Sequence, residues 1–395
     1  MNAREVVICN PVRTAIGSYN GSLKAIPAPD LGAAVIAECM RRAVLDGEKV
    51  DAVLMGNVIQ AGNGMNPARQ ASIGGGLPVS VPAMTINRVC GSGAQAIASA
   101  AQEVLLGFAD VAVAGGMENM DRAPYLVPSG RWGNRMGDGV MYDSMLRDGL
   151  NDAFSGHHSG WHTEDLASRY GLRRLEQDEW AVRSQQRFAR AKAAGRFDSQ
   201  IVGVNVSSGR ETKIFDFDES SRPETTVESL AKLKPAFRPS GTITAGNAPG
   251  LNAGAAAMLV ADRAKADALG LSPMARLVGY GVGAVEPSMF GLGPIPAVKK
   301  ALKRAGWALK EVDRFEINEA FAAVPLAVIR ELGIAPDVVN VEGGAIAHGH
   351  AIGATGAVLV VRLLHSLLAD DLRRGIVTLC IGGGQGIALA LESLK

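Results

Sequence analysis

Cysteine is scarce in this sequence, and the scarcity excludes two kinds of domain. The four cysteines are too few and too scattered for a disulfide framework: Cys9, Cys39, Cys90 and Cys380. No Cys-x-x-Cys pair indicates a zinc site. We therefore expect reduced, intracellular thiols and no bound metal.

The chain also has no charge excess of one sign and no long apolar run, and only 5% of its residues are aromatic. The formal net charge of +1 provides no general attraction for nucleic acid or an anionic membrane. No apolar run approaches the roughly 18 residues of a membrane span, and residues 1–5 lead into a short strand rather than a signal-like segment. We expect a cytoplasmic protein without nucleic-acid or membrane partners, in which any anion site is local.

Glycine is abundant, with 48 residues in a chain of 395, and short apolar runs alternate with helical periods. This pattern predicts an α/β protein of two or three units with largely parallel sheets. Strands are expected at residues 6–9, 53–58, 79–89, 110–114, 256–261, 276–279, 314–317, 338–341 and 375–380. Helices are expected at residues 31–45 after Asp30 as N-cap, and at 68–73, 92–106, 174–194, 296–305, 320–332 and 353–368.

Residues 119–247 differ from the rest of the chain in composition and in the regularity of their pattern. Irregular pieces with Pro, Arg, Asp, Trp and His surround one amphipathic helix. An insertion of this length more often forms a lid or a binding region than an inert loop.

The stretch 85–94 places Cys90 between an expected strand and an expected helix. The unpaired N–H groups and the dipole of a helix N-terminus favour an anion, here the thiolate of a nucleophile. Gly91 and Gly93 leave the sulfur open to a substrate and allow a sharp turn. A buried structural thiol is the alternative, because free cysteine is among the most buried residue types.

The two ends of the chain resemble each other. Cys90, a small-residue helix and the strand run 111–116 are echoed by His350, a second small-residue helix and the run 376–383. A duplicated α/β unit would place the starts of equivalent helices near one pseudo-twofold axis. We therefore expect Cys90 and His350 to meet from opposite halves of the sequence.

Three further segments carry polar groups among small and apolar residues. Asn318 ends a strand, where ligands of α/β sheets collect, and the glycine-rich loop 343–353 carries His348 and His350 into a helix. Cys380 ends another strand before Gly382. Each signal alone is weak, but two cysteines, a histidine and an asparagine at element ends form a testable acyl-transfer site.

At these residues the chain resembles the thiolase family, which contains the acetyl-CoA acetyltransferases and 3-ketoacyl-CoA thiolases. The resemblance runs from Val6 to the C-terminus and rests on Asn87-x-x-Cys90-Gly-Ser-Gly, Asn318-Glu-Ala-Phe, Gly349-His350 and Cys380-x-Gly-Gly-Gly. It implies two pseudo-symmetric α/β halves that form a layered αβαβα core with an inserted loop domain. The implied boundaries are 1–120 and 251–272 for the N-terminal half, 121–250 for the insertion and 273–395 for the C-terminal half.

The resemblance also implies a mechanism. Cys90 would take an acyl group from acyl-CoA while His350 accepts its proton, and Cys380 would exchange a proton with the α-carbon of acetyl-CoA. The N–H groups of Gly382 and Gly383 could stabilise the second thiolate. His350 with a water held by Asn318 would form one oxyanion hole, and the N–H groups of Cys90 and Gly382 the other.

Coenzyme A and acyl-CoA are implied as substrates, with no permanently bound cofactor. The residues expected to contact them are Leu150, His158, Ser159, Arg222, Ser229, Phe237, Ala245, Ala248, Leu251, Phe290, Ala320 and Phe321. Arg222 would stack on adenine or meet phosphate, and Lys213 and Arg210 are weaker candidates.

The chain departs from the family pattern near the acyl group and the pantetheine arm. Ser159 and Phe290 stand where short-chain members carry methionine, and Pro249 replaces a serine whose hydroxyl is expected to bind pantetheine. Ala351 replaces a proline, and His348 replaces an aliphatic residue. These changes leave the acyl-chain preference open between short chains and medium or long chains.

Other functions fit the residues less well. A decarboxylating ketoacyl synthase would need histidines where Asn318 and Cys380 stand, and a dehydrogenase would need a helix and a ribose-binding acid after residues 382–386. A silent acyl-CoA-binding scaffold would not need both cysteines. The resemblance further implies a homotetramer of dimers, with the strand region at Thr85 at a twofold axis and residues 122–138 as a tetramerisation loop.

Overall fold

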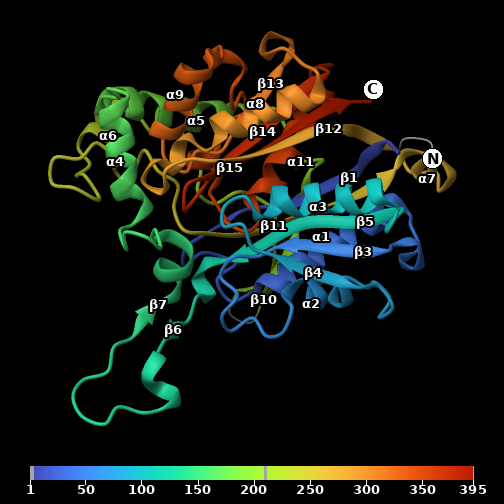
Figure 1. The fold of residues 1–395 in the computed structure, drawn as a ribbon, viewed down its shortest axis with the longest axis horizontal. Coiled ribbons are helices and arrows are strands. Elements are labelled where there is room, and N and C mark those ends of the chain that lie inside the picture. Colours follow the sequence, from blue (N-terminus) through green and yellow to red (C-terminus); the bar gives the residue numbers. More distant parts are fainter. Residues whose placement is uncertain (1–3, 209–210, 395) are drawn as a thin grey trace.

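The computed structural model describes residues 4–208 and 211–394, and its centre is a sheet of eleven strands in that part of the chain (Figure 1). The main path of the sheet runs β13-β14-β15-β12-β1-β11-β5-β3-β4, and β2 and β8 pair beside it. The strands are β1 (Val6–Thr14), β2 (Gly17–Ser18), β3 (Ala52–Gly56), β4 (Ala83–Ile86), β5 (Val111–Asn119), β8 (Ile201–Val202), β11 (Asn252–Asp262), β12 (Pro273–Ala284), β13 (Arg314–Ile317), β14 (Arg374–Ile381) and β15 (Gln385–Ser393).

The sheet is mixed, so the expectation of largely parallel sheets is wrong. β3 runs parallel to β4 and β5, and β13 runs parallel to β14. The central strands β1, β11, β12 and β15 pair antiparallel with their neighbours along the main path. Helices cover both faces of this sheet, so its antiparallel strands also read as continuous apolar runs, which is the pattern that predicts parallel strands.

The strand order divides into two matching halves. The N-terminal half has the order β1-β11-β5-β3, and the C-terminal half has the same order in β12-β15-β14-β13. The halves join where β1 pairs with β12, with Val7 opposite Arg276. The predicted thiolase-type architecture of two pseudo-symmetric halves is therefore present in the strand order.

Two helices lie in the middle layer between the halves. α3 (Ser92–Leu106) packs on β3 and β5, α11 (Thr355–Ala369) packs on β13 and β14, and the two helices contact each other. α1 (Ala28–Ala43) and α2 (Pro67–Gly74) cover the outer face of the N-terminal half, while α8 (Pro294–Ala305) covers that of the C-terminal half (Figure 1). The apolar core follows the same layers: one cluster lies between the halves and one under each outer face.

Glycine allows α3 and α11 to approach within backbone contact. A Cβ on Gly356 would lie 2.3 Å from the backbone nitrogen of Ala94, and one on Gly93 would lie 2.7 Å from that of Ala357. The sequences Ser-Gly-Ala at 92–94 and Thr-Gly-Ala at 355–357 therefore match in position as well as in type. This contact brings the two helix N-termini together at the centre of the molecule.

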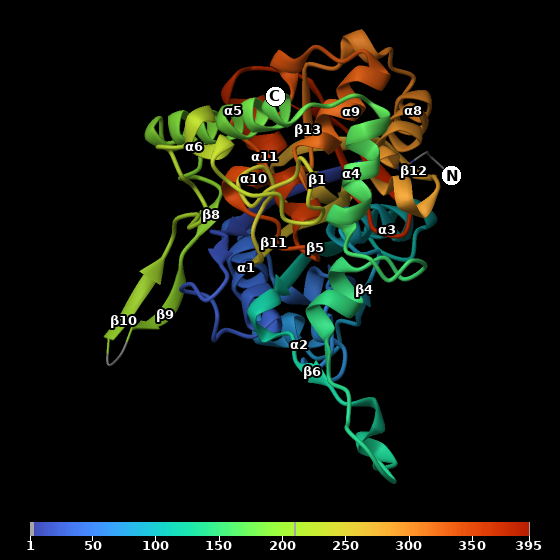
Figure 2. The same cartoon turned by 90° about the vertical axis from the view of Figure 1, so that its left-hand side faces the viewer.

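The halves differ in what connects their matching strands. In the C-terminal half a turn at residues 382–384 joins β14 to β15, whereas in the N-terminal half residues 120–251 separate β5 from β11. Figure 2 shows two projections from this insertion, the β9–β10 hairpin and the excursion beyond β6. The insertion contains β6 (Tyr125–Leu126), β7 (Tyr142–Asp143), α4 (Ser159–Arg169), α5 (Arg174–Ala193), β9 (Val204–Ser208), β10 (Glu211–Phe215) and α6 (Val227–Ala231).

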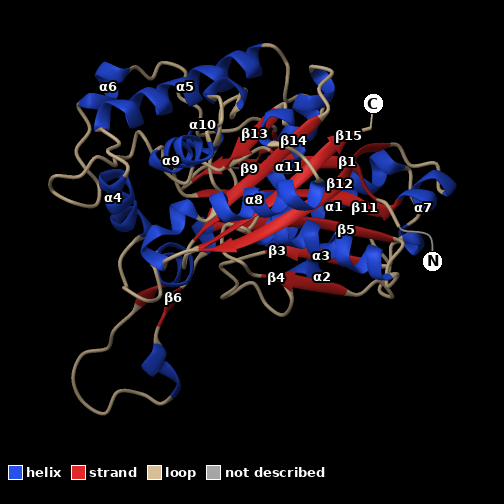
Figure 3. Cartoon of the chain, turned by 45° about the horizontal axis from the view of Figure 1, so that its top comes forward, coloured by secondary structure: helices blue, strands red, loops and turns tan. Residues whose placement is uncertain are grey.

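Short helical pieces complete the fold (Figure 3). Within the described ranges, no helix combines the length and apolarity needed to cross a membrane. The remaining α-helices are α7 (Arg263–Ala268), α9 (Ala323–Leu332) and α10 (Ala345–His348). Met145–Leu150 is a π-helical segment, and single 3-10 segments lie at Gly47–Lys49, Met120–Arg122, Pro128–Arg131, Pro287–Leu292, Leu309–Glu311 and Pro336–Val338.

Several expected element boundaries are wrong for local reasons. The first helix starts at Ala28 after Pro27, so Asp30 lies in its first turn and is not its N-cap. The extended segment expected at 79–89 is a strand only over Ala83–Ile86. The strand expected at 338–341 is absent from the described structure, because Pro336 opens a 3-10 turn and only Val339 bridges to a strand. The helix expected from residue 320 begins at Ala323.

Candidate active site

Cys90 occupies a tight turn between β4 and α3. Val89, directly before it, has a φ of 44°, a left-handed conformation that is costly for a β-branched residue. The hydroxyl of Ser92 holds the turn, because it accepts a hydrogen bond from the Arg88 N–H at 2.8 Å and donates to the Val89 carbonyl at 2.6 Å. The sulfur-bearing residue therefore lies on strained backbone that its neighbours hold in place, and it remains partly exposed.

The glycines around Cys90 have a role different from the one expected. A Cβ on Gly91 would lie 2.5 Å from the Ile381 side chain. The Gly93 Cβ position faces the backbone of α11, as described above. Both glycines therefore permit contact with the C-terminal half, and the idea that they clear a path for substrate is wrong.

His350 lies in the loop between α10 and α11. Its Nδ1 is 2.8 Å from the hydroxyl oxygen of Thr355, and that hydroxyl donates to the Ala351 carbonyl at 2.8 Å. The Thr355 oxygen must then accept from Nδ1–H, which leaves Nε2 with a free lone pair. Asn318 Nδ2 lies 3.3 Å from Nε2 and can donate to it. Burial lowers the pKa of His350 to about 4, so the imidazole is neutral and able to accept a proton.

Cys380 lies at the end of β14 and is fully buried. Burial raises the pKa of its thiol well above the usual value, and the neighbouring Cys90 raises it further. The expected stabilisation of this thiolate by the Gly382 and Gly383 N–H groups is therefore not found in the free protein. The effect of Cys90 on the pKa of Cys380 indicates that the two thiols, from opposite halves of the fold, lie close to each other.

Burial also decides the state of Cys90. It raises the pKa of this thiol to about 11, against the opposing effect of the backbone N–H groups of Gly382 and of Cys90 itself. The expectation that the helix N-terminus would favour a thiolate is wrong for the free protein. A neutral thiol beside a neutral imidazole calls for proton transfer to the base during attack rather than before it.

A cavity of about 270 Å³ opens beside Cys90, His350 and Gly382. Ten of the twelve predicted substrate contacts line it: Leu150, His158, Ser159, Phe237, Ala245, Ala248, Leu251, Phe290, Ala320 and Phe321. The ring of His158 stacks on Phe237 at a centroid distance of 4.6 Å. Asn318 and Cys380 are fully buried behind this lining and do not form part of it.

A second cavity of about 340 Å³ shares residues 245, 248–251 with the first. Arg222 lines it, and its guanidinium has no hydrogen bond or ion pair to another described residue. Ser229 lines neither cavity, because its hydroxyl donates to the Thr226 carbonyl in the capping box of α6. Lys213 also lines neither cavity and lies on β10, while Arg210 is outside the described residues.

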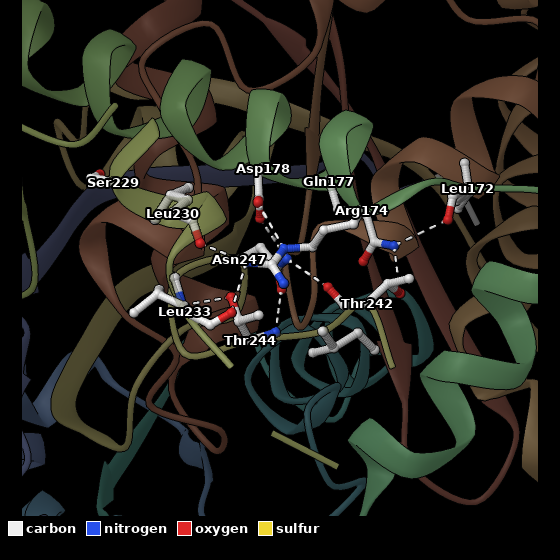
Figure 4. Close-up of polar contacts among 12 residues, drawn as sticks. Leu172, Arg174, Gln177, Asp178, Ser229, Leu230, Leu233, Thr242, Thr244 and Asn247 are labelled. Atoms are coloured by element: carbon white, nitrogen blue, oxygen red, sulfur yellow. Dashed lines mark hydrogen bonds and ion pairs between the residues drawn. The ribbon is translucent and has the colours of Figure 1, made fainter. Parts of the chain in front are cut away.

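Asn247 anchors the loop that the two cavities share. Its Nδ2 donates to Asp178 at 2.9 Å and to the Thr242 carbonyl at 3.1 Å, and its Oδ1 accepts from the Thr244 N–H at 2.8 Å (Figure 4). Its carbonyl accepts from the Ala322 N–H at 2.9 Å. The loop is thus tied both to α5 and to the segment that follows Asn318. Figure 4 also shows Ser229 at the margin of this network.

Comparison with known proteins identifies this arrangement. The family description "Thiolase, N-terminal domain" matches residues 6–264, and "Thiolase, C-terminal domain" matches residues 271–393. The chain belongs to the thiolase family. An acetyl-CoA acetyltransferase of Pseudomonas aeruginosa is 53% identical over 98% of this chain and 99% of its own length, and one of Escherichia coli (strain K12) is 51% identical over 99% and 100%.

Other thiolase relatives extend the comparison to structure and to a second printed name. A probable acetyl-CoA acyltransferase of Staphylococcus aureus (strain COL) is 49% identical over 99% of both chains. The crystal structure of the Bacillus anthracis acetyl-CoA acetyltransferase has a TM-score of 0.97 at 43% identity and covers all of both chains. The predicted thiolase fold and the predicted acyltransferase activity are confirmed. The predicted domain boundaries and the roles of individual residues remain predictions.

The departures from the thiolase pattern fall into two groups in space. Ser159, Pro249 and Phe290 line the first cavity, and the Ser159 hydroxyl donates to the Leu150 carbonyl at 2.7 Å. His348 and Ala351 are buried and do not line it. Only the first group can contact a substrate directly.

The sequence interpretation missed several lining residues and one buried acid. Met120, Thr244 and Ile352 also line the first cavity, although none of them is among the predicted contacts. Glu118 is fully buried beside the loops that carry the site, and the strand expected at 110–114 stops short of it. A charged residue after a run of buried strand positions was the available signal, because such residues are seldom buried without partners.

Proposed function

We propose that this chain catalyses the reversible reaction of 3-oxoacyl-CoA and CoA to acyl-CoA and acetyl-CoA, with acetoacetyl-CoA as the preferred 3-oxoacyl substrate. The observation that carries the proposal is the convergence of Cys90, His350 and Gly382 on one cavity, with Cys380 behind it. The relatives named as acetyl-CoA acetyltransferases support the short chain.

The first step is acyl transfer to Cys90. In thiolysis, the Cys90 proton passes to Nε2 of His350 while the sulfur attacks the 3-oxo carbon of the substrate. The bond between carbons 2 and 3 then breaks, and its electron pair leaves on the acetyl-CoA unit as an enolate. Cys380 protonates carbon 2 of that enolate, which releases acetyl-CoA.

The second step releases the acyl group. The thiol of CoA gives its proton to the Cys380 thiolate left by the first step and attacks the acyl-Cys90 thioester. The Cys90 sulfur then leaves and takes back the proton held by His350. Developing oxyanions need donors, which we assign to the N–H groups of Cys90 and Gly382 and to a water held near Asn318 and His350. In condensation the steps run backward, and Cys380 removes the proton from carbon 2 of acetyl-CoA.

The anionic nucleotide of CoA fits the second cavity. Arg222 offers an unpaired guanidinium there, and the shared loop 248–251 lies between this cavity and Cys90. The pantetheine arm would cross that loop, where Pro249 lacks a side-chain donor. CoA and acyl-CoA are substrates in this scheme, no resident cofactor is needed, and we propose that the reaction takes place in the cytoplasm.

A panel of 3-oxoacyl-CoA chain lengths tests the substrate. Purified protein should cleave acetoacetyl-CoA in the presence of CoA with a higher kcat/KM than it cleaves six- to ten-carbon 3-oxoacyl-CoA. Faster thiolysis of the longer substrates would replace the short-chain assignment with a medium- or long-chain one. Absence of thiolysis for every length would leave an acyl-CoA-binding protein without turnover.

We also propose a homotetramer built from dimers. β4 is the end strand of the sheet path, and Met84 on it is 48% exposed, which suits pairing across a twofold axis. The excursion between β6 and β7 carries Trp132 and Met136, which are 85% and 94% exposed. Such exposed apolar side chains on a projecting segment suit a second interface.

Light scattering tests the assembly. The wild-type protein should have the mass of four chains, and the double variant Trp132→Ser, Met136→Ser should have the mass of two because its second interface is weakened. Leu106→Ser is a matched control, since Leu106 is also exposed but lies at the end of α3, away from the excursion. A monomeric wild-type protein would refute the proposal.

A further inference from the structure

The strand register assigns each residue of one half a counterpart in the other. In the N-terminal half, Gly56 lies opposite Gly116 on β5, and Glu118 lies opposite Gly254 on β11. In the C-terminal half, Ile317 lies opposite Thr378 on β14, and Cys380 lies opposite Gly386 on β15. Glu118 and Cys380 are thus each two residues beyond the paired position, and each faces a glycine on the next strand.

Two further positions agree with this register. Asn57 follows the end of β3 as Asn318 follows the end of β13, so the two asparagines are counterparts. The Ser-Gly-Ala and Thr-Gly-Ala starts of α3 and α11 make Cys90 the counterpart of Gly353, rather than of His350. The triplet Cys90, Cys380 and Asn318 therefore has a partner triplet in Gly353, Glu118 and Asn57.

Glu118 makes the hydrogen bonds that Cys380 lacks. One carboxylate oxygen accepts from Asn57 Nδ2 at 2.8 Å and from the Ile59 N–H at 3.3 Å. The other accepts from the Val58 N–H and the Gly353 N–H, both at 3.0 Å. All four donors point at a side chain with no exposed surface, so both oxygens serve as acceptors.

These bonds join the two halves beside the candidate site. Residues 57–59 belong to the N-terminal half, and Ile59 packs in a small cluster with Ile352 and Cys90. Gly353 belongs to the C-terminal half and lies three residues after His350. A bond from Gly353 to Glu118 therefore limits how far the His350 loop can move from the loop beneath Cys90.

We propose that Glu118 is a positioning residue for the reaction, which holds the His350 loop in register with Cys90 through the hydrogen bond to Gly353. It does not touch the substrate, since it does not line the cavity. The inference rests on the proposed function for its turnover readout. The inference goes beyond the proposed function because it assigns a role to a residue outside the predicted active-site motifs.

Glu118→Gln is the sharpest test because it preserves size and changes only one acceptor. A glutamine amide must turn its NH2 group toward two N–H donors, either the pair from Asn57 and Ile59 or the pair from Val58 and Gly353. Donors facing donors repel, so the loops separate. We expect kcat to fall by about 100-fold, the loss associated with a misplacement on the order of 1 Å, with KM changed much less.

Glu316→Gln is the matched control. Glu316 is also a buried strand glutamate, but its Oε2 has no hydrogen-bond partner among the described residues and it does not line the cavity. The control should retain wild-type kcat. Equal losses in both variants would show that any buried carboxyl supports the fold equally and would overturn the proposal, as would wild-type kcat in Glu118→Gln.

Alkylation of Cys90 by iodoacetamide gives a readout that needs no turnover. Burial is the main cause of the raised pKa of Cys90, and the charge of Glu118 raises it further. Burial raises the pKa of Glu118 itself to about 7, so this charge acts above that pH, and Glu118→Gln should there shift the pH profile of alkylation toward lower pH while kcat falls. Loss of folding would also expose Cys90 and shift its profile toward lower pH, so the shift counts only if circular dichroism shows that the variant is folded. An unchanged profile, together with a loss of kcat, would reduce Glu118 to a structural residue.

A milder variant covers the case in which Glu118→Gln does not fold. Asn57→Ala removes one donor and leaves the carboxylate with three, so kcat should fall in the same direction by about tenfold or less. Wild-type kcat in Asn57→Ala would then count against the proposal. If the wild-type protein itself fails to cleave acetoacetyl-CoA, the proposed function is lost, whereas the alkylation shift still tests the effect of Glu118 on Cys90.

Discussion

The two halves of this thiolase have the same strand order and place different chemistry at the same backbone positions. At the end of β14, Cys380 is buried without charge and close to Cys90. At the matching end of β5, Glu118 is buried and binds four N–H donors. A duplicated scaffold thus supplies two equivalent strand ends, one with a buried thiol and the other with a carboxyl group that is hydrogen-bonded to residues of both halves.

The halves also differ in what lies between matching strands. A three-residue turn follows β14, and the Gly382 N–H in this turn faces Cys90. The long insertion after β5 instead supplies most of the cavity wall and both projections of the chain. In the proposed mechanism the substrate site needs both halves, because one carries the acid–base groups and the other carries the nucleophile and most of the binding surface.

The largest effect should follow from Cys90→Ala. Removal of the nucleophile should abolish the acyl-enzyme and lower turnover by about four orders of magnitude or more. Mass spectrometry after incubation with acetyl-CoA checks the adduct directly. Cys39→Ala is a control from the same half, since Cys39 is buried in the outer layer. A normal acyl adduct in Cys90→Ala would refute the nucleophile assignment.

Cys380→Ser should distinguish the role of Cys380 from that of Cys90. A serine hydroxyl is a far weaker acid and base for a carbon-bound proton, so condensation should fall by about 100-fold or more. Acyl loading of Cys90 should persist, because His350 and Cys90 are unchanged. Rates of loading and of condensation are measured on the same preparation. Equal losses in the two rates would contradict the role of Cys380 as the base for carbon 2.

The matching asparagines, Asn318 and Asn57, allow a direct comparison of the two strand ends. Asn318→Ala should lower kcat by about 100-fold through loss of an oxyanion contact, with little change in the free energy of unfolding. Asn57→Ala should lower kcat by about tenfold or less and should also lower that free energy by about 1–3 kcal/mol, because it leaves buried acceptors on Glu118 and Met117 with fewer donors. Urea unfolding and steady-state kinetics on both variants decide the matter. A large loss of kcat in Asn57→Ala together with a loss of stability alone in Asn318→Ala would mean that the roles of the two strand ends are assigned the wrong way round.

The smallest expected effect concerns pH. The pKa of His350 is about 4 in the folded protein, below its ordinary value of 6.5, so the folded state binds fewer protons than the unfolded state between these values. The contribution of His350 to stability is therefore complete above pH 6.5 and is lost as the pH falls toward 4. Urea midpoints at pH 7 and pH 4.5 should differ less in His350→Asn than in the wild-type protein.

The same protonation should govern loading of Cys90. Between pH 7 and about pH 5 the imidazole stays neutral, so acyl loading should change little through loss of the base. Loading should fall below pH 5 as His350 takes up a proton. A decline centred near 6.5 would mean that the imidazole is not desolvated in solution.

Much of the architecture could be predicted from local patterns. The helix at 92–106 and the strand at 314–317 have the expected bounds, because small-residue periodicity and a short apolar run are local signals. Strand direction could not be predicted in this way. The antiparallel pairing of β1 with β12 depends on contacts more than 250 residues apart in the chain, and a buried strand looks the same in either direction.

The candidate site could likewise be predicted only in part from the sequence. The sequence by itself determined which residues could react, because thiols, an imidazole and an amide at element ends next to glycines favour acyl transfer. Only the tertiary structure decided their states and partners. Burial keeps both thiols protonated, Thr355 selects the His350 tautomer, and strand register pairs Glu118 with Cys380. Desolvation and register arise from groups distant in the chain, so no local pattern carries them.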